Sequence, residues 1–247
     1  MEQSNTFLSN LPKDIAPHNA VEMRLLQEYG SMFVARGVAS PTKIVFEDAD
    51  DVLRFQNGVE SARHMLGDFE IELQRSAMAD LTKALAEATS SGLSITPRGA
   101  DSAKRSYEET VGLWASRVEP ALKHWVSEGK LTQKVAENIR SLSPFQQVPV
   151  ILGLEEKGIY FAKDLSKTIL YSVAPPGTSQ HLAMLALDIQ EFENPEVRKF
   201  LARWKWYQTV VSDLPHFTYL GVEESELPTL GLKKVADGDR TFWVPDF

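Results

Sequence analysis

The sequence predicts an α+β protein in which helices come first and a small, mainly antiparallel sheet carrying the candidate metal site comes second. Residues 70–142 place apolar side chains at helical spacing. Beyond Pro149 the chain changes to short segments rich in β-branched and aromatic residues. Several connections between those segments are too short for a crossover helix, which favours antiparallel pairing.

The first 92 residues are expected to form two helices and one short strand. Residues 1–15 have the composition of a polar tail, and 19–29 ("NAVEMRLLQEY") have helical spacing. The segment "TKIVF", 43–47, predicts a strand. The clearest helix is expected over 71–92, where apolar residues recur every four positions before a C-terminal glycine.

The rest of the chain is expected to hold further helices and then the sheet. Two helices are predicted over 106–128 and 132–142, and one more over 194–206. Strands are predicted in five segments, namely 167–174, 181–189, 207–211, 216–222 and 240–244. We expect one domain of catalytic size over 61–247, preceded by an N-terminal extension over 1–60.

Composition excludes several classes of function. The chain has 34 acidic and 26 basic residues and a net charge of -8, which argues against a nucleic-acid partner. It has no cysteine, so disulfides, zinc–thiolate sites and thiol nucleophiles are ruled out. Apolar runs are too short for a transmembrane segment, and the first residues lack the profile of a signal peptide. Any metal must be held by histidine, carboxylate or backbone oxygen.

One histidine and one aspartate flank the apolar run "HLAMLALD". His181 and Asp188 are seven positions apart, so on a straight strand they would point to opposite faces. For both to face one ion, the chain must bend between them, and Ala183 and Met184 lie where it could do so. His216, which opens another strand-like segment, is the best candidate for a third ligand.

Two imidazoles, one carboxylate and an open fourth position are typical of a catalytic zinc site. The metal would make a water molecule more acidic and polarise a carbonyl group. Asp213, three residues before His216, has the chemistry of a general base. Spacing alone leaves a structural alternative, in which His181 caps a strand and Asp188 is solvated, because five histidines and 34 acids make some such trio almost inevitable.

Three motifs add to this pattern. Residues 179–188, "SQHLAMLALD", resemble the S-x-H-x-x-G-x-A-x-D signature of the vancomycin-resistance-type zinc D-alanyl-D-alanine carboxypeptidases and dipeptidases. Residues 213–221, "DLPHFTYLG", are similar to that family's E-x-W-H and the aromatic strand after it. Residues 102–109, "SAKRSYEE", are similar to its S-G-Y-R-S-Y loop. The motifs follow the family's order, and the resemblance covers roughly 70–221.

The resemblance implies a role for each matching position. The zinc ligands would be His181, Asp188 and His216. Asp213 would be the general base, and Arg105 would contact the substrate and the developing oxyanion. Ser179 would lie beside the substrate's C-terminal carboxylate. The implied fold is the D-Ala-D-Ala metallopeptidase or hedgehog-like fold. The implied reaction is zinc-dependent hydrolysis of a D-alanyl-D-alanine or related bond in peptidoglycan stem peptides. The implied location is the bacterial cell envelope if a signal peptide has been removed, and the cytoplasm otherwise.

The chain departs from the family's pattern at five positions. The family's Gly, Glu, Trp, Tyr and Gln are replaced by Met184, Asp213, Pro215, Lys104 and Thr110. An aspartate reaches about one bond less far than a glutamate, and a misplacement near 1 Å can cost roughly a hundredfold in rate. These departures keep open a catalytically weak or inactive module that binds zinc and cell-wall peptide. An endopeptidase acting on cross-links is a third reading.

Two roles have alternative candidates. Arg98, in the glycine-flanked loop "TPRGAD", could replace Arg105 as the substrate arginine. An acidic turn after the last strand of the resemblance could supply a longer base than Asp213, from Glu223, Glu224 or Glu226.

Overall fold

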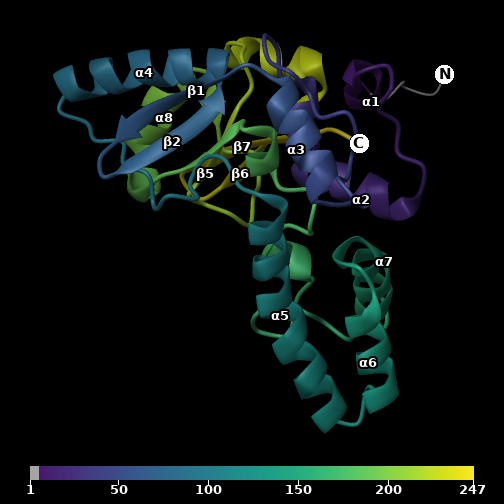
Figure 1. The fold of residues 1–247 in the computed structure, drawn as a ribbon. Coiled ribbons are helices and arrows are strands. Elements are labelled where there is room, and N and C mark those ends of the chain that lie inside the picture. The colour runs from purple at the N-terminus through teal and green to yellow at the C-terminus, as the bar shows by residue number, and fades with distance from the viewer. Residues whose placement is uncertain (1–5) are drawn as a thin grey trace. The chain divides into compact units, whose positions relative to one another are not determined.

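The structure is a computed structural model that describes residues 6–247 (Figure 1). Spatial contacts divide the chain into two compact units. The first unit comprises the chain up to Ile44, Arg54–Arg105 and Gln180–Phe247, and the second comprises Val45–Leu53 and Ser106–Ser179. The expected division into 1–60 and 61–247 stays a prediction, because a division by spatial contacts does not test it. The α+β prediction is confirmed, since within residues 6–247 helices accompany three small antiparallel sheets.

The second unit is helical. It contains α5 (Tyr107–Ser127), α6 (Gln133–Ser141) and α7 (Pro144–Glu155). The helices predicted over 106–128 and 132–142 are confirmed, and α7 was not predicted. The strand predicted over 167–174 is wrong. That segment holds the 3-10 turn η2 (Ile169–Tyr171), because the Thr168 side chain accepts the Leu170 N–H and the buried Glu155 carboxylate accepts the Ile169 N–H at 2.7 Å.

The first unit opens with short helices. These are α1 (Thr6–Asn10), α2 (Ala20–Tyr29) and the 3-10 helix η1 (Gly30–Val34). The helix α3 (Ala49–Gly58) is divided between the units, and its residues from Arg54 onward belong to the first. The helix predicted over 19–29 is confirmed, with Asn19 as its cap. The strand predicted over 43–47 is wrong, since the segment forms bends and belongs to none of the sheets among the described residues.

The first four residues of the helix predicted over 71–92 belong instead to the second strand of a hairpin. β1 (Ser61–Leu66) and β2 (Phe69–Gln74) pair antiparallel, and α4 begins only at Arg75 and ends at Ser90. The segment "FEIELQ" alternates acidic and apolar residues, and Ile71 and Leu73 are buried while Glu70 is exposed. This period of two is that of a strand with one face on the core.

A three-stranded sheet brings the candidate site together. Its order is β3 (Ala186–Asp188), β5 (His216–Tyr219) and β4 (Trp206–Tyr207), all antiparallel. The register sets Asp188 directly opposite His216. α8 (Pro195–Arg203) connects β3 to β4 after the 3-10 helix η4 (Gln190–Glu193). The strands predicted over 181–189 and 207–211 are therefore much shorter than expected.

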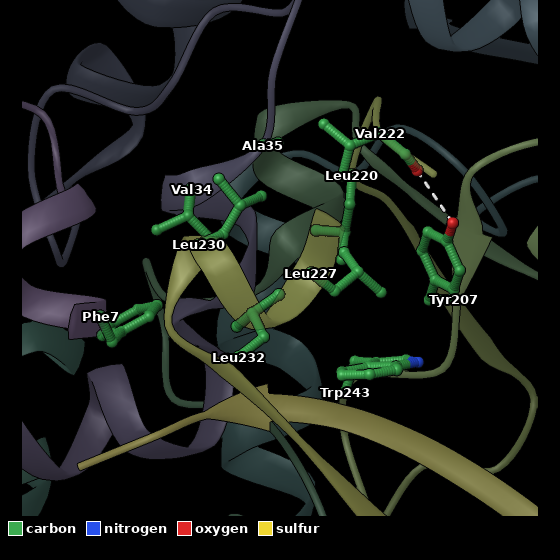
Figure 2. Close-up of a cluster of buried hydrophobic side chains, with 10 residues drawn as sticks. All are labelled: Phe7, Val34, Ala35, Tyr207, Leu220, Val222, Leu227, Leu230, Leu232 and Trp243. Atoms are coloured by element: carbon green, nitrogen blue, oxygen red, sulfur yellow. Dashed lines mark hydrogen bonds between the residues drawn. The ribbon is translucent and has the colours of Figure 1, made fainter. Parts of the chain in front are cut away.

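A buried apolar cluster joins both ends of the first unit (Figure 2). Phe7, fully buried, lies with residues of η1, of the 3-10 helix η5 (Glu224–Leu230) and of the hairpin β6 (Leu232–Asp237)–β7 (Arg240–Pro245). The Tyr207 hydroxyl closes the cluster by donating to the Val222 carbonyl at 2.8 Å. The prediction of a polar tail over 1–15 is therefore wrong for its described part, because Phe7 supplies an apolar anchor.

A buried carboxylate ties α4 to the sheet. Asp80 accepts hydrogen bonds from the Tyr219 hydroxyl at 2.8 Å and from the Lys205 ammonium at 3.1 Å. Burial alone would raise the pKa of Asp80, but these two bonds outweigh it and the pKa lies below its ordinary value. No helix within residues 6–247 combines the length and the apolar composition of a membrane span.

Candidate metal centre

Three buried side chains converge on one point of the first unit. His181 Nε2 lies 3.3 Å from Asp188 Oδ1, and His216 Nδ1 lies 3.1 Å from the same oxygen. One ligand atom from each residue lies within 4.8 Å of the other two. In a tetrahedral zinc site with donors about 2.0 Å from the metal, neighbouring donors are about 3.3 Å apart. Two of the three donor separations therefore match the ligand edges of such a site, and the third lies within 4.8 Å.

A sharp bend makes the convergence of His181 and Asp188 possible. Met184, between them, has a φ of 55°, in the left-handed region that L residues with side chains rarely adopt. The Met184 N–H donates to the His181 carbonyl at 3.1 Å, and β3 begins two residues later. The prediction that the chain bends at Ala183 and Met184 is confirmed. At this position the family signature has glycine, the residue for which such a conformation costs least.

Two buried glutamines hold the bend in place. Gln74 donates from its side chain to the Ala183 carbonyl at 2.8 Å and from its backbone N–H to the Met184 carbonyl at 3.1 Å. Gln56 donates to the Leu182 carbonyl at 3.1 Å. Because each of these inward-facing carbonyls has a donor, the bend can be buried without an unsatisfied backbone group.

The loop between α4 and α5 holds both ligand segments. The Asp188 N–H donates to the Ser102 carbonyl at 2.9 Å, and the Arg98 N–H donates to the Asp188 carbonyl at 3.1 Å. The Arg105 N–H reaches the His181 carbonyl at 3.4 Å. These backbone bonds fix two segments seven residues apart against one loop.

The hydrogen bond of His181 leaves one ring nitrogen available. Its Nδ1 lies 2.7 Å from the Ala103 carbonyl oxygen, which can only accept, so Nδ1 carries the hydrogen. Nε2 therefore carries a lone pair, and this buried atom has no hydrogen-bond partner within the described chain. Burial of the ring lowers the pKa of His181, which favours the neutral form that binds metals.

The surroundings of Asp188 favour its ionised carboxylate. Its Oδ1 faces the two imidazoles, and its Oδ2 accepts a hydrogen bond from Arg105 Nη2 at 2.8 Å. Burial alone would raise the pKa of Asp188, but its interactions with His181 and His216 outweigh burial and hold the pKa well below its ordinary value. One carboxylate oxygen is thus oriented by the arginine and the other points at the histidines.

The donor set fits a divalent cation. A carboxylate oxygen and the lone pair of His181 Nε2 meet in a buried space together with His216 Nδ1. Donor atoms this close are stabilised either by a cation between them or by a hydrogen on one nitrogen, as in the contact between His216 Nδ1 and Asp188 Oδ1. Two imidazole nitrogens and one carboxylate oxygen are a ligand set that zinc takes at catalytic sites.

The other predicted site residues lie in different environments. The Arg105 guanidinium also donates from Nε to the Asp101 carbonyl at 2.9 Å, and within residues 6–247 its Nη1 has no partner. Asp213 is exposed, and its carbonyl accepts the His216 N–H at 3.2 Å. Ser179 is buried at the end of the second unit. The geometry gathers the three proposed ligands with Arg105 and leaves Asp213 outside that group.

The alternative candidates are engaged elsewhere. Arg98 is exposed, with its guanidinium 5.9 Å from the centre of the Phe192 ring. Glu223 and Glu226 cap the 3-10 helix η5 reciprocally. Sequence reasoning missed Gln180, whose Oε1 lies 2.8 Å from His216 Nε2. The available signal was an amide side chain next to a candidate ligand in an otherwise apolar run.

Comparisons with known proteins give a structural likeness and no match in sequence. No family model matches the chain, and no curated protein matches its sequence. Among solved structures, the chain is similar to a mutant of the vancomycin-resistance D,D-pentapeptidase VanY, from a VanB-type resistance cassette, in complex with Zn(II). The identity is 16%, the alignment covers 67% of this chain and 82% of that one, and the TM-score is 0.36. At this TM-score the likeness is too loose to support a shared reaction or shared site residues.

Proposed function

We propose that the chain is a zinc-dependent peptidase that hydrolyses a D-alanyl-D-alanine or related D-amino-acid bond at the end of peptidoglycan stem peptides. The fold would be of the D-Ala-D-Ala metallopeptidase or hedgehog type, and the place of action the bacterial cell envelope. One observation carries the proposal, namely the convergence of two buried imidazoles and one carboxylate, whose donor atoms all lie within 4.8 Å of one another. The three ordered sequence motifs narrow the substrate class.

His181, Asp188 and His216 would hold the zinc ion, through Nε2, Oδ1 and Nδ1. When bound, zinc supplies Lewis acidity, which polarises a carbonyl group and makes a water molecule acidic near neutral pH. Two neutral imidazoles and one carboxylate leave a net positive charge on such a site, which favours that acidity.

Arg105 and Asp213 would act on the substrate. Arg105 is fixed by Asp188 and the Asp101 carbonyl, and its Nη1 is left to donate to a substrate carboxylate or to the developing oxyanion. Asp213 would take a proton from water and pass it to the leaving amine. Because it is exposed and lies outside the ligand group, this role requires its side chain to turn toward the ligands when substrate binds. Ser179 would lie beside the substrate's C-terminal carboxylate.

A second function is favoured by the same position of Asp213. Within residues 6–247, the donor group at this point contains a single carboxylate, Asp188, and no second acid joins it. A chain with this group and no base would bind zinc and cell-wall peptide without cleaving it. The departures from the family pattern at Met184, Asp213 and Pro215 agree with this reading.

Metal analysis and a release assay separate these functions. We expect about one zinc per wild-type chain, loss of that zinc in His181→Ala and Asp188→Ala, and full retention in His18→Ala, whose side chain is exposed and remote in sequence. Incubation with a pentapeptide ending in D-Ala-D-Ala should then release D-alanine, and a chelator should stop the release until zinc is restored.

The outcomes discriminate clearly. Zinc binding with D-alanine release that Asp213→Asn abolishes supports the peptidase. Zinc binding and peptide binding with no release supports the binding module. Full metal content in both His181→Ala and Asp188→Ala excludes the site itself.

A further inference from the structure

We infer that Gln180 is the positioning residue that selects the metal-binding tautomer of His216. The inference rests on the proposed function in one respect, since it assigns this role toward the zinc site. A neutral imidazole carries one hydrogen on either Nδ1 or Nε2, and only the other nitrogen can bind a metal. For His216 to offer Nδ1, the hydrogen must be on Nε2.

The orientation of the Gln180 amide follows from its neighbours. Gln180 Nε2 lies 2.9 Å from the Tyr29 carbonyl oxygen, which accepts hydrogen bonds and cannot donate them. The NH2 end of the amide must therefore point at Tyr29. The amide oxygen then points at His216, with a separation of 2.8 Å between Oε1 and Nε2.

A buried hydroxyl pair supports the same orientation. Thr218 Oγ1 donates to Gln180 Oε1, and Thr218 Oγ1 and Thr209 Oγ1 lie 2.7 Å apart. Gln180 is 1% exposed and both threonines are fully buried, so no bulk water competes for these bonds. Both ends of the Gln180 amide therefore make hydrogen bonds in addition to the one with the imidazole.

Two acceptors compete for the single hydrogen of His216. Gln180 Oε1 faces Nε2 at 2.8 Å, and Asp188 Oδ1 faces Nδ1 at 3.1 Å. Without the amide oxygen, the carboxylate would draw the hydrogen to Nδ1 and close the ligand position. With it, an Nδ1–H tautomer would set the Nε2 lone pair against the Oε1 lone pair. Gln180 thus favours the tautomer whose Nδ1 lone pair faces the metal position.

The His181 ring obtains the same selection from a backbone group. The Ala103 carbonyl takes the Nδ1 hydrogen and leaves Nε2 for the metal. The two imidazoles therefore offer opposite ring nitrogens, and each is set by an acceptor on its far side. Partners of this kind are typically worth about 10- to 100-fold in metal affinity.

Substitution of Gln180 tests the inference with two independent measurements. Gln180→Met keeps the length of the side chain and removes the acceptor, whereas Gln180→Glu keeps an acceptor oxygen. Ser31→Ala is the control, because it removes a buried hydroxyl of the same unit that donates to the Trp243 carbonyl and leaves Gln180, Thr209, Thr218 and His216 unchanged. Thermal unfolding selects conditions in which all variants are folded. Zinc affinity is measured by chelator competition, and the ¹⁵N shifts of His216 give its tautomer in the metal-free protein at about pH 8.

We expect Gln180→Met to lower zinc affinity by about 10- to 100-fold and to increase the Nδ1–H fraction of His216, and Gln180→Glu and Ser31→Ala to change either quantity much less. The inference is overturned if Gln180→Met leaves the tautomer or the affinity unchanged, or if Gln180→Glu loses as much affinity as Gln180→Met. If the wild-type chain binds no zinc, the proposed function fails, and the tautomer measurement still decides the role of Gln180.

Discussion

The left-handed residue between the ligands gives a stability prediction with a definite sign. Met184 has a φ of 55° and is fully buried. Met184→Ala should cost about 2–5 kcal/mol, because it leaves a cavity. Met184→Gly removes one more carbon, but it also relieves the left-handed backbone, where a residue with a Cβ is destabilised by roughly 1–2 kcal/mol. Glycine should therefore be the more stable of the two replacements, by about 1 kcal/mol.

A second buried methionine provides the control. Met78 lies inside α4 and is 4% exposed. There the order should reverse, with Met78→Ala more stable than Met78→Gly by about 1 kcal/mol, because glycine weakens a helix interior. Urea unfolding of the four variants measures the difference in stability between glycine and alanine at each position. Because that difference has opposite signs at 184 and 78, the two values should lie roughly 2 kcal/mol apart. An alanine variant more stable than the glycine variant at position 184 would refute the bend that brings His181 and Asp188 together.

Three further predictions concern the site and its support. Arg105→Lys keeps the charge but loses the fork that spans Asp188 and Asp101, and zinc affinity measured by chelator competition should fall about tenfold; unchanged affinity would mean that Arg105 does not orient the ligand. Asp80→Asn should lower stability by about 2 kcal/mol at pH 7, and because the folded pKa of Asp80 is lowered, the gap to wild type should shrink as urea unfolding is repeated below about pH 4. A gap that stayed constant with pH would count against the ionised form of Asp80 as the source of that stability. Phe7→Ala should cost about 3–5 kcal/mol in the same assay, whereas a loss near zero would mean that the N-terminal helix does not belong to the core.

The sequence predicted the long amphipathic helices well because their apolar positions repeat over several turns. It also predicted a bend at Ala183 and Met184, because His181 and Asp188 are seven positions apart and would point to opposite faces of a straight strand. The start of α4 could not be placed from the same pattern. Ile71 and Leu73 fit a strand and also continue the apolar spacing of the helix after them, and only pairing with β1 decides between the two.

The site was predictable in its ligands and not in their surroundings. His181, Asp188 and His216 are marked by residue type and motif. The acceptors that set the imidazole tautomers are the Ala103 carbonyl and the Gln180 amide, and a backbone carbonyl carries no signal in the sequence. The burial of Phe7 was missed for a related reason, because several of its partners lie more than 200 positions away in η5, β6 and β7.

The most direct test is diffraction from crystals of the zinc-loaded protein at the zinc absorption edge. The account predicts one anomalous peak per chain, about 2.0–2.2 Å from Nε2 of His181, a carboxylate oxygen of Asp188 and Nδ1 of His216. If the only peaks lie at other histidines, or if His216 binds through Nε2, then the two rings and the carboxylate do not form the metal site.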